Sequence, residues 1–173
     1  QRFANAIEAY SPALKRISGL RTYHSPIFFA RGVSFEREKN WKAAEADLHR
    51  ALGLKPDQPD VLNYLGYTWL MRNENLDKAK SMIAKAVKER PNDPQIIDSM
   101  GWALYTLRQY EDSVAYLEKA LELLPGDPTI NDHLGDVYWR LGRKTEARYQ
   151  WERSLIYLPE AGDAALIKKK LKD

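Results

Sequence analysis

The sequence repeats itself with a period of about 34 residues, and this period limits the folds open to the chain more than any other feature. Four glycines and four prolines recur at nearly equal spacing, and small and large apolar residues keep the same phase. The equivalent positions are Gly32/Gly66/Gly101/Gly135, Pro56/Pro91/Pro125/Pro159, Ala44/Ala79/Ser113/Ala147, Leu48/Ile83/Leu117/Trp151 and Ala51/Ala86/Ala120/Ser154. A fixed period of this length indicates stacked supersecondary units.

Each unit has the pattern of two amphipathic helices joined by a tight turn. In residues 94–125, apolar or small residues recur at helical spacing on both sides of residues 108–111, which leave room only for a short connection. The glycine lets two helix backbones approach closely, and the proline ends the unit because it cannot continue a helix. A single hairpin of this size cannot bury both of its apolar faces, so the hairpins must stack on one another.

The order of these positions resembles the tetratricopeptide repeat family. That family has a large residue, Leu–Gly and an aromatic residue in the first helix, followed by Ala, a large residue and Pro in the second. The resemblance covers about Ser25 to Pro159, with departures at Arg31, Asn131 and Lys144 in the first and last repeats. It implies an all-α fold, namely a right-handed α-solenoid of antiparallel helix hairpins.

The period also predicts how the chain is divided. The expected parts are the second helix of a truncated preceding repeat plus a linker (1–24), four repeats (25–58, 59–93, 94–127 and 128–161) and a C-terminal helix that caps the last hairpin or starts a further repeat (162–173). First helices are expected near 26–38, 60–72, 95–107 and 129–141, and second helices near 42–54, 77–89, 111–123 and 145–157. The helix over residues 2–17 is expected to be interrupted or bent near Ser11–Pro12, and residues 18–24 are expected to form the weakest joint.

Composition excludes several function classes. The formal charge of +3 is too small to indicate nucleic-acid binding, and single-stranded RNA is only a minor alternative. The chain has no cysteine for a disulfide or a thiol nucleophile, and no apolar run approaches the ~18–20 residues of a membrane span. Basic residues are expected on a solvated outer surface, the alternative being contact with an acidic protein or anionic lipid. They include Lys78, Lys80, Lys85, Lys88, Arg90, Lys168, Lys169, Lys170 and Lys172.

The resemblance implies that first helices line a concave groove in which a partner binds. A spacing of i, i+4, i+7 independently places one polar and aromatic stripe on each first helix. The predicted groove residues are Asn63, Tyr64, Tyr67, Asp98, Trp102, Tyr105, Asp132, His133, Asp136, Trp139 and Arg140. Stiff aromatic rings beside hydrogen-bonding Asn and Asp side chains suit an extended peptide. The alternative is that some rings only wedge between adjacent first helices. Trp41, Trp69 and Trp151 fall at packing positions and are expected in the core.

The groove residues also predict the charge of the partner. Family members that bind acidic C-terminal tails clamp carboxylates with Lys, Asn and Arg. The corresponding positions here carry Asp98 and Trp102, then Asp132 and Asp136, with His133 in place of an Asn. Carboxylates would repel an acidic tail, so a neutral or basic partner is expected.

A catalytic or metal site has little support from the sequence. Asp132, His133 and Asp136 lie close on one helix and could form a metal or acid–base cluster, but no orienting partner or pocket motif accompanies them. His24 and His49 are isolated by register. We therefore expect a protein that is not an enzyme and has no cofactor or metal.

The leading hypothesis is a binding scaffold or adaptor, and the alternative is an architectural or oligomerisation module of a larger assembly. A narrower resemblance, to the C-terminal repeats of bacterial cell-envelope proteins that are periplasmic or lipoproteins, is carried by LNYLGYTWLMRNENLDKA, IIDSMGWALY and TINDHLGDVYWRLGRKTEARYQW. Some of those proteins are adaptors for processing proteases. This resemblance implies a periplasmic location, with the cytoplasm as the alternative.

Overall fold

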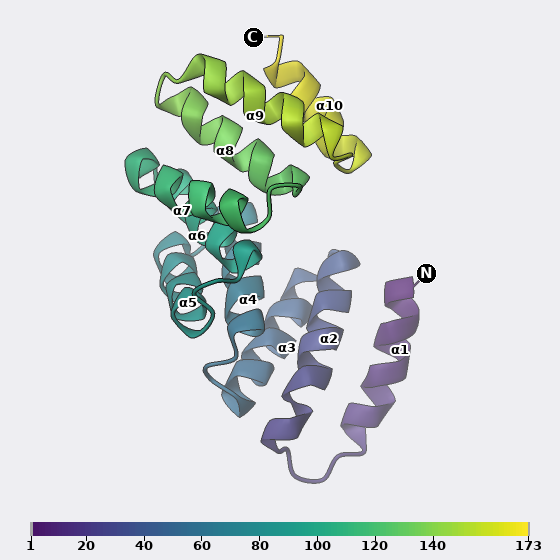
Figure 1. Ribbon diagram of the computed structural model, residues 1–173. Helices are drawn as coiled ribbons and strands as arrows, with labels where there is room; N and C mark the ends of the chain where they lie inside the picture. The colour runs from purple at the N-terminus through teal and green to yellow at the C-terminus, as the bar shows by residue number, and fades with distance from the viewer. Residues whose placement is uncertain (1, 173) are drawn as a thin grey trace. The chain divides into compact units, whose positions relative to one another are not determined.

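A computed structural model describes residues 2–172, and over this range the chain is helical with no strand (Figure 1). The all-α prediction is therefore confirmed. The elements are α1 (Arg2–Lys15), the 3-10 turn η1 (Thr22–His24), α2 (Ser25–Arg37), α3 (Trp41–Leu54), α4 (Pro59–Met71), α5 (Leu76–Glu89), α6 (Pro94–Thr106), α7 (Tyr110–Leu123), α8 (Pro128–Arg140), α9 (Lys144–Ile156) and α10 (Ala161–Lys170). The chain divides into two compact units, which meet in sequence between Leu65 and Gly66 within α4.

The first helices begin one residue earlier than expected because each starts on or next to a proline. Pro94 and Pro128 are the first residues of α6 and α8, where the missing proline N–H costs no hydrogen bond. The preceding residues, Asp93 and Asp127, cap these helices, since each side chain accepts hydrogen bonds from two backbone N–H groups of the first turn.

In the first unit, α2 and α3 form a packed hairpin and α1 lies beside α2 (Figure 1). α1 continues through Pro12, so the helix is not interrupted there, and a bend at this position stays a prediction. All of Arg2–Lys15 is described, and none of these residues is buried. The following linker is better anchored than expected. His24 is buried, and its Nδ1 accepts a hydrogen bond of 2.9 Å from the Arg21 N–H, so this histidine is a capping residue and not an isolated one.

In the second unit, the hairpins α6–α7 and α8–α9 pack against each other through α7 and α8. The periodic glycines explain how closely the helices approach. A Cβ added to Gly101 would lie 2.5 Å from Leu117 Cγ, and one added to Gly135 would lie 2.5 Å from Trp151 Cδ1. Ser113, at the small-residue position of the same repeat, donates a 2.7 Å hydrogen bond from Oγ to the Gly101 carbonyl.

The periodic large residues form the core as expected. Leu48, Ile83 and Leu117 are completely buried, and the Trp151 side chain is 2% exposed. Trp69 is buried as well. The expectation for Trp41 is wrong: this residue is only half-buried, because it begins α3 and has no preceding turn of its own helix beside it.

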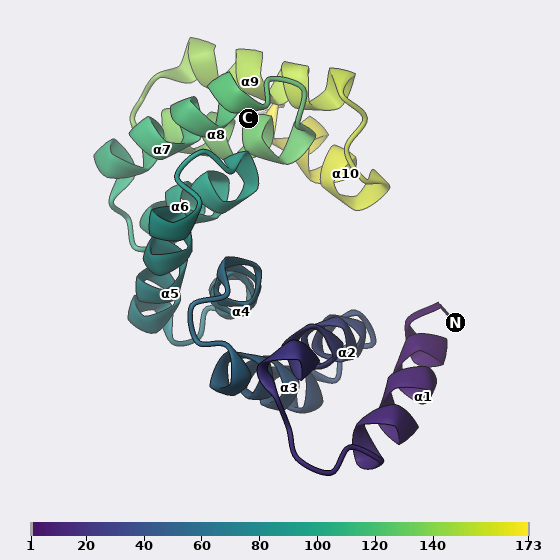
Figure 2. The ribbon, with the colours of Figure 1, turned by 60° about the horizontal axis from the view of Figure 1, so that its bottom comes forward.

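α10 covers the last hairpin and packs against α9 (Figure 2). Its Ile167 is fully buried in the cluster that also holds Trp151. Lys169 stands one repeat period after Gly135, at the position where close helix packing would need a small residue, and its side chain is exposed. This exposed lysine is a departure from the repeat pattern, and both interpretations of α10, a cap or the start of a further repeat, stay predictions.

Candidate functional site

The predicted groove residues lie on α4, α6 and α8. Asn63 and Tyr64 belong to the first unit, and the other nine belong to the second. We call the nine residues of the second unit the first-helix face. They are Tyr67, Asp98, Trp102, Tyr105, Asp132, His133, Asp136, Trp139 and Arg140.

In the first unit, Tyr64 bridges two first helices. Its hydroxyl donates a 2.9 Å hydrogen bond to Glu36 Oε2 on α2, and its ring meets the Phe29 ring edge-on at 5.7 Å between centroids. Burial, together with the Glu36 carboxylate, raises the pKa of the Tyr64 hydroxyl. The wedge interpretation therefore applies to Tyr64. Its neighbour Asn63 has a buried Oδ1 without a hydrogen-bond partner among the described residues.

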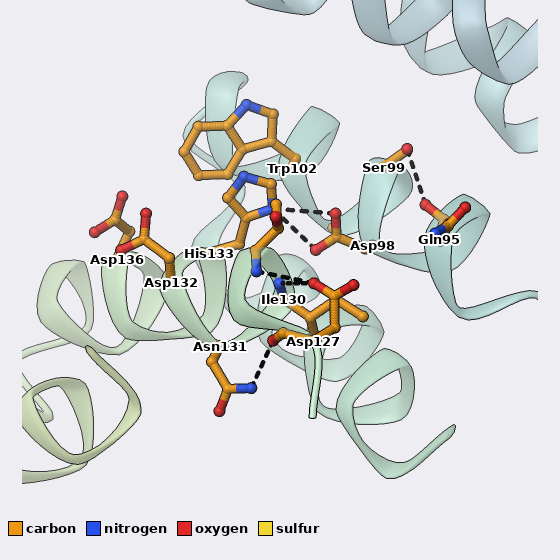
Figure 3. Close-up of polar contacts among 12 residues, drawn as sticks. Gln95, Asp98, Ser99, Trp102, Asp127, Ile130, Asn131, Asp132, His133 and Asp136 are labelled. Carbon is orange, nitrogen blue, oxygen red and sulfur yellow. Dashed lines mark hydrogen bonds and ion pairs between the residues drawn. The ribbon is translucent and has the colours of Figure 1, made fainter. Parts of the chain in front are cut away.

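In the second unit, Trp102 on α6 stands in a column of three rings. Its indole stacks on the Tyr105 ring at 4.6 Å and on the His133 imidazole of α8 at 4.0 Å, with interplanar angles of 14° and 16°. Figure 3 shows the His133 ring lying under the indole and turned toward Asp98. Two rings of the protein therefore already occupy part of the aromatic surface of Trp102. The ring remains half-buried and is not enclosed in the core.

His133 is held in this column by Asp98. Its Nδ1 lies 2.9 and 3.1 Å from the two carboxylate oxygens, and each residue is 6% exposed (Figure 3). Burial alone would lower the pKa of His133. The charges of Asp98, Asp132 and Asp136 and the hydrogen bond to Asp98 raise this pKa by a larger amount, so the pKa of His133 lies above its ordinary value. The pair joins α6 to α8. Burial, followed by the nearby Asp98 charge, also raises the pKa of Tyr67.

Asp132 and Asp136 share one cation, the ammonium of Lys170 on α10. Lys170 Nζ lies 2.8 and 3.0 Å from the Asp132 oxygens and 2.7 Å from Asp136 Oδ1. Trp151 Nε1 donates a 3.1 Å hydrogen bond to the same Asp136 oxygen. Burial and then the Asp136 charge raise the pKa of Asp132 against the opposing effect of Lys170. Burial lowers the pKa of Lys170, but the two aspartates raise it more.

Sequence reasoning missed Lys170 as a site residue, because it grouped this lysine with the solvated basic run at the C-terminus. The repeat period contains the signal that could have found it, since Lys170 stands one period after Asp136. This contact also corrects the argument about partner charge. Asp98 is paired with His133, and both other aspartates are paired with Lys170, so the three carboxylates are not free. A neutral or basic partner stays a prediction, because paired carboxylates do not by themselves repel an acidic partner.

Trp139 and Arg140 lie at the end of α8. Lys144 Nζ sits 3.2 Å from the centre of the Trp139 ring, and that ring meets Trp151 at 5.3 Å between centroids. Lys144, a departure from the family pattern, thus makes a cation–π contact. Arg140 is exposed, and its Nε donates a 3.3 Å hydrogen bond to the Tyr105 hydroxyl.

These side chains surround a cavity of about 230 Å³. It is lined by Tyr105, Asp136, Trp139, Arg140, Trp151 and Lys170. Four of the six were predicted groove residues, and the other two come from α9 and α10. Aromatic walls with a few fixed polar groups are typical of a site that orients a ligand by packing and hydrogen bonding.

The described part of the chain gives no support for a metal site or for a membrane-spanning helix. Among residues 2–172, no cluster of three or more His, Cys, Asp or Glu side chains is placed to hold a metal ion. Over the same residues, no helix combines the length and apolar character that crossing a membrane requires.

Comparison with known proteins gives matches over most of the chain. Two family profiles, both described as tetratricopeptide repeat, match residues 37–101 and 99–166. TPR repeat-containing protein PA4667 of Pseudomonas aeruginosa is 34% identical over 103 residues, which is 58% of this chain and 18% of that protein. The chain therefore spans less than a fifth of this relative.

Solved structures with the same fold include a crystal structure of PilW, described as a widely conserved type IV pilus biogenesis factor. It has a TM-score of 0.83 and 19% identity, over 98% of this chain and 76% of PilW. MamA MSR-1 has a TM-score of 0.69 and 17% identity, over 90% of this chain and 87% of MamA. At these identities the likeness shows the fold alone. That likeness confirms the expectation of an α-solenoid of helix hairpins.

Proposed function

Because the chain belongs to the tetratricopeptide repeat family, whose members bind protein partners, we propose that it is a non-enzymatic scaffold and that the first-helix face is its binding surface. The ligand is a flexible segment of a partner protein. The segment contacts the edges of the ring column and places one side chain in the cavity beside Trp139.

One observation carries this proposal: the 230 Å³ cavity is lined by aromatic side chains that are already fixed in place. Lys144 holds the Trp139 ring, and Arg140 holds the Tyr105 hydroxyl. Binding to side chains that are already ordered costs less conformational entropy than binding to a surface whose side chains must first be ordered. The half-exposed Trp and Tyr rings also supply the residue types that dominate binding energy in protein interfaces.

We further propose a cell-envelope role, as an adaptor that brings a partner to a processing protease. Support comes from the resemblance of the repeat sequences to those of envelope proteins. It also comes from the fold shared with PilW, whose description names pilus biogenesis.

The test compares capture of partners by matched variants of the full-length protein. Three proteins serve as baits: the wild type, a double variant with Trp139→Ala and Arg140→Ala, and the control variant Tyr149→Ala. Tyr149 is 54% exposed on α9 and does not line the cavity. We expect envelope proteins captured by the wild type and by Tyr149→Ala to be lost from the double variant, with helicity unchanged by circular dichroism. Equal capture by all three baits would contradict the binding site. Recovery of only ribosomal or cytosolic proteins would contradict the envelope role.

The architectural alternative has one observation in its favour. α1 presents apolar side chains that the described chain leaves uncovered, among them Phe3 at 37% exposed. If this helix mediates assembly, deletion of residues 2–17 will lower the sedimentation coefficient of the assembly while the double variant above leaves it unchanged. An unchanged coefficient after the deletion would remove this alternative.

A further inference from the structure

We propose that α10 is an internal competitor for the first-helix face: Lys170 fills a cation-accepting site on α8, and a lysine or arginine side chain of the partner displaces it. The inference rests on the proposed binding function, and it adds both the chemistry of the partner and a means of regulation.

The site around the Lys170 ammonium has the composition of a cation receptor. Two carboxylates lie within 3.0 Å of Nζ, and the Trp151 ring centre lies 5.8 Å away. Trp151 Nε1 fixes Asp136, so the receptor is held from the core side. Charge-assisted hydrogen bonds together with an aromatic face are the contacts by which proteins select ammonium and guanidinium groups.

The rest of α10 is held weakly, so exchange at this site is feasible. Ile167 is the one residue of Ala161–Lys170 that is buried, and Leu166 of the same helix is 61% exposed. Just after the helix, the Leu171 carbonyl accepts a 2.7 Å hydrogen bond from exposed Arg148 Nη2. The helix has ten residues, and isolated helices shorter than ~12–15 residues are marginal in water. The contacts that keep α10 docked are therefore few: Lys170, Ile167 and the partly buried Leu171, which packs against the same core cluster.

The cavity of about 230 Å³ gives an incoming side chain a route to the receptor. Lys170 and Asp136 form part of its wall together with the Tyr105 and Trp139 rings. A water molecule occupies about 30 Å³ in the liquid, so the cavity has room for the end of a long side chain before Lys170 leaves. An incoming cation also keeps the half-buried aspartates paired, which avoids the cost of exposing them to each other without a counter-charge.

The experiment first compares three variants of the chain with two probes, amidated tetralysine and amidated tetraglutamate, at physiological ionic strength. Lys170→Met removes the ammonium and keeps the aliphatic stem, and Lys170→Arg keeps the cation. Lys169→Met is the matched control, because Lys169 is the exposed neighbour on the same helix. Binding is followed by calorimetry and by the tryptophan side-chain signals in NMR spectra.

We expect Lys170→Met to bind tetralysine about tenfold more tightly than the wild type, because the fraction of molecules with an open receptor rises. Lys170→Arg and Lys169→Met should bind as the wild type does, and tetraglutamate should bind none of them. Adding Asp132→Asn and Asp136→Asn to Lys170→Met should abolish the gain. Unchanged overall helicity shows that Lys170→Met is folded, and faster amide exchange across α10 shows that this helix opens more often.

Equal tetralysine affinity in Lys170→Met and Lys169→Met would overturn the proposal, as would a gain that survives loss of both aspartates. Unfolding of Lys170→Met does not end the test, because Lys170→Gln with the same probes replaces it. The two proposals fail in different ways. If Lys170→Met gains affinity but the cavity variants capture the native partner normally, the receptor stands and the proposed function falls. If Lys170→Met gains no affinity but the cavity variants lose the native partner, the proposal that α10 competes for the site is rejected and the proposed scaffold function stands.

Discussion

Asp98 on α6 and His133 on α8 form a buried pair, with His133 Nδ1 2.9 Å from Asp98 Oδ1 and each residue 6% exposed. The two residues are 35 positions apart and come from consecutive repeats. The contact therefore joins neighbouring hairpins at the surface proposed to bind a partner. It also holds the His133 ring flat against Trp102, so the shape of that surface depends on it.

Removing His133 should destabilise the second unit. His133→Ala leaves the Asp98 carboxylate buried without its partner, and breaking a buried ion pair in this way costs about 3–5 kcal/mol. His49→Ala is the control, because His49 is exposed on α3 and surface substitutions usually change stability by less than about 0.5 kcal/mol. Urea unfolding of both variants checks the prediction. Similar small losses would mean that the pair contributes little.

The same pair predicts how stability changes with pH. The pKa of His133 is raised in the folded state, so the folded protein holds this proton more tightly than the unfolded chain does. The stabilisation is complete below the unfolded pKa of about 6.5 and is lost as the pH rises through the folded value. The free energy of unfolding should therefore fall between neutral and mildly alkaline pH in the wild type. In His133→Gln this fall should be absent, and an identical pH profile for the two proteins would refute the assignment.

A methyl group at Gly101 should be costly. The new Cβ of Gly101→Ala would lie 2.5 Å from Leu117 Cγ, and overpacking of this kind costs about 1–3 kcal/mol. Gly53→Ala in α3 is the matched control, because among the described residues nothing lies within 4 Å of the added Cβ. There the gain in helix propensity should leave stability unchanged or raise it by up to about 1 kcal/mol. Thermal unfolding of the two variants gives the comparison, and a stabilised Gly101→Ala would contradict the packing described.

Trp102 should matter for stability as well as for binding. Its two stacked neighbours each contribute about 0.5–1.5 kcal/mol beyond burial, so Trp102→Ala should lower the free energy of unfolding by at least about 1–3 kcal/mol. Arg140→Ala should leave it nearly unchanged, because Arg140 is exposed. Chemical unfolding separates the two cases. If Trp102→Ala is as stable as the wild type, the ring column is not a structural contact.

The repeat period was sufficient to predict the helices, because each glycine and proline marks a fixed point of a hairpin. The buried positions of Leu48, Ile83 and Leu117 follow from the same period. It could not predict that two other rings of the protein stack on Trp102. Register places a residue on a face of its own helix, but the distance between α6 and α8 decides whether rings on that face touch each other or a partner.

The sequence predicted which residues lie on the first-helix face, but not how their charges pair. Asp98, His133, Asp132 and Asp136 were placed on one surface, yet their pairing depends on contacts between residues 34 to 38 positions apart. Lys170 was the largest omission. Its role depends on how α10 docks, and Ile167 is the one deeply buried anchor within that helix, which the short C-terminal segment does not reveal by periodicity.

The central claim is that the first-helix face contacts a partner protein. Site-specific photo-crosslinking in cells tests it most directly, with p-benzoylphenylalanine replacing Arg140 at the cavity or Tyr149 on the outer side of α9 in the full-length protein. The account predicts one discrete crosslinked protein at position 140, competed by an excess of the unlabelled chain, and no such product at position 149. Crosslinking at 149 alone, or at neither position while the partner still co-purifies, would contradict it.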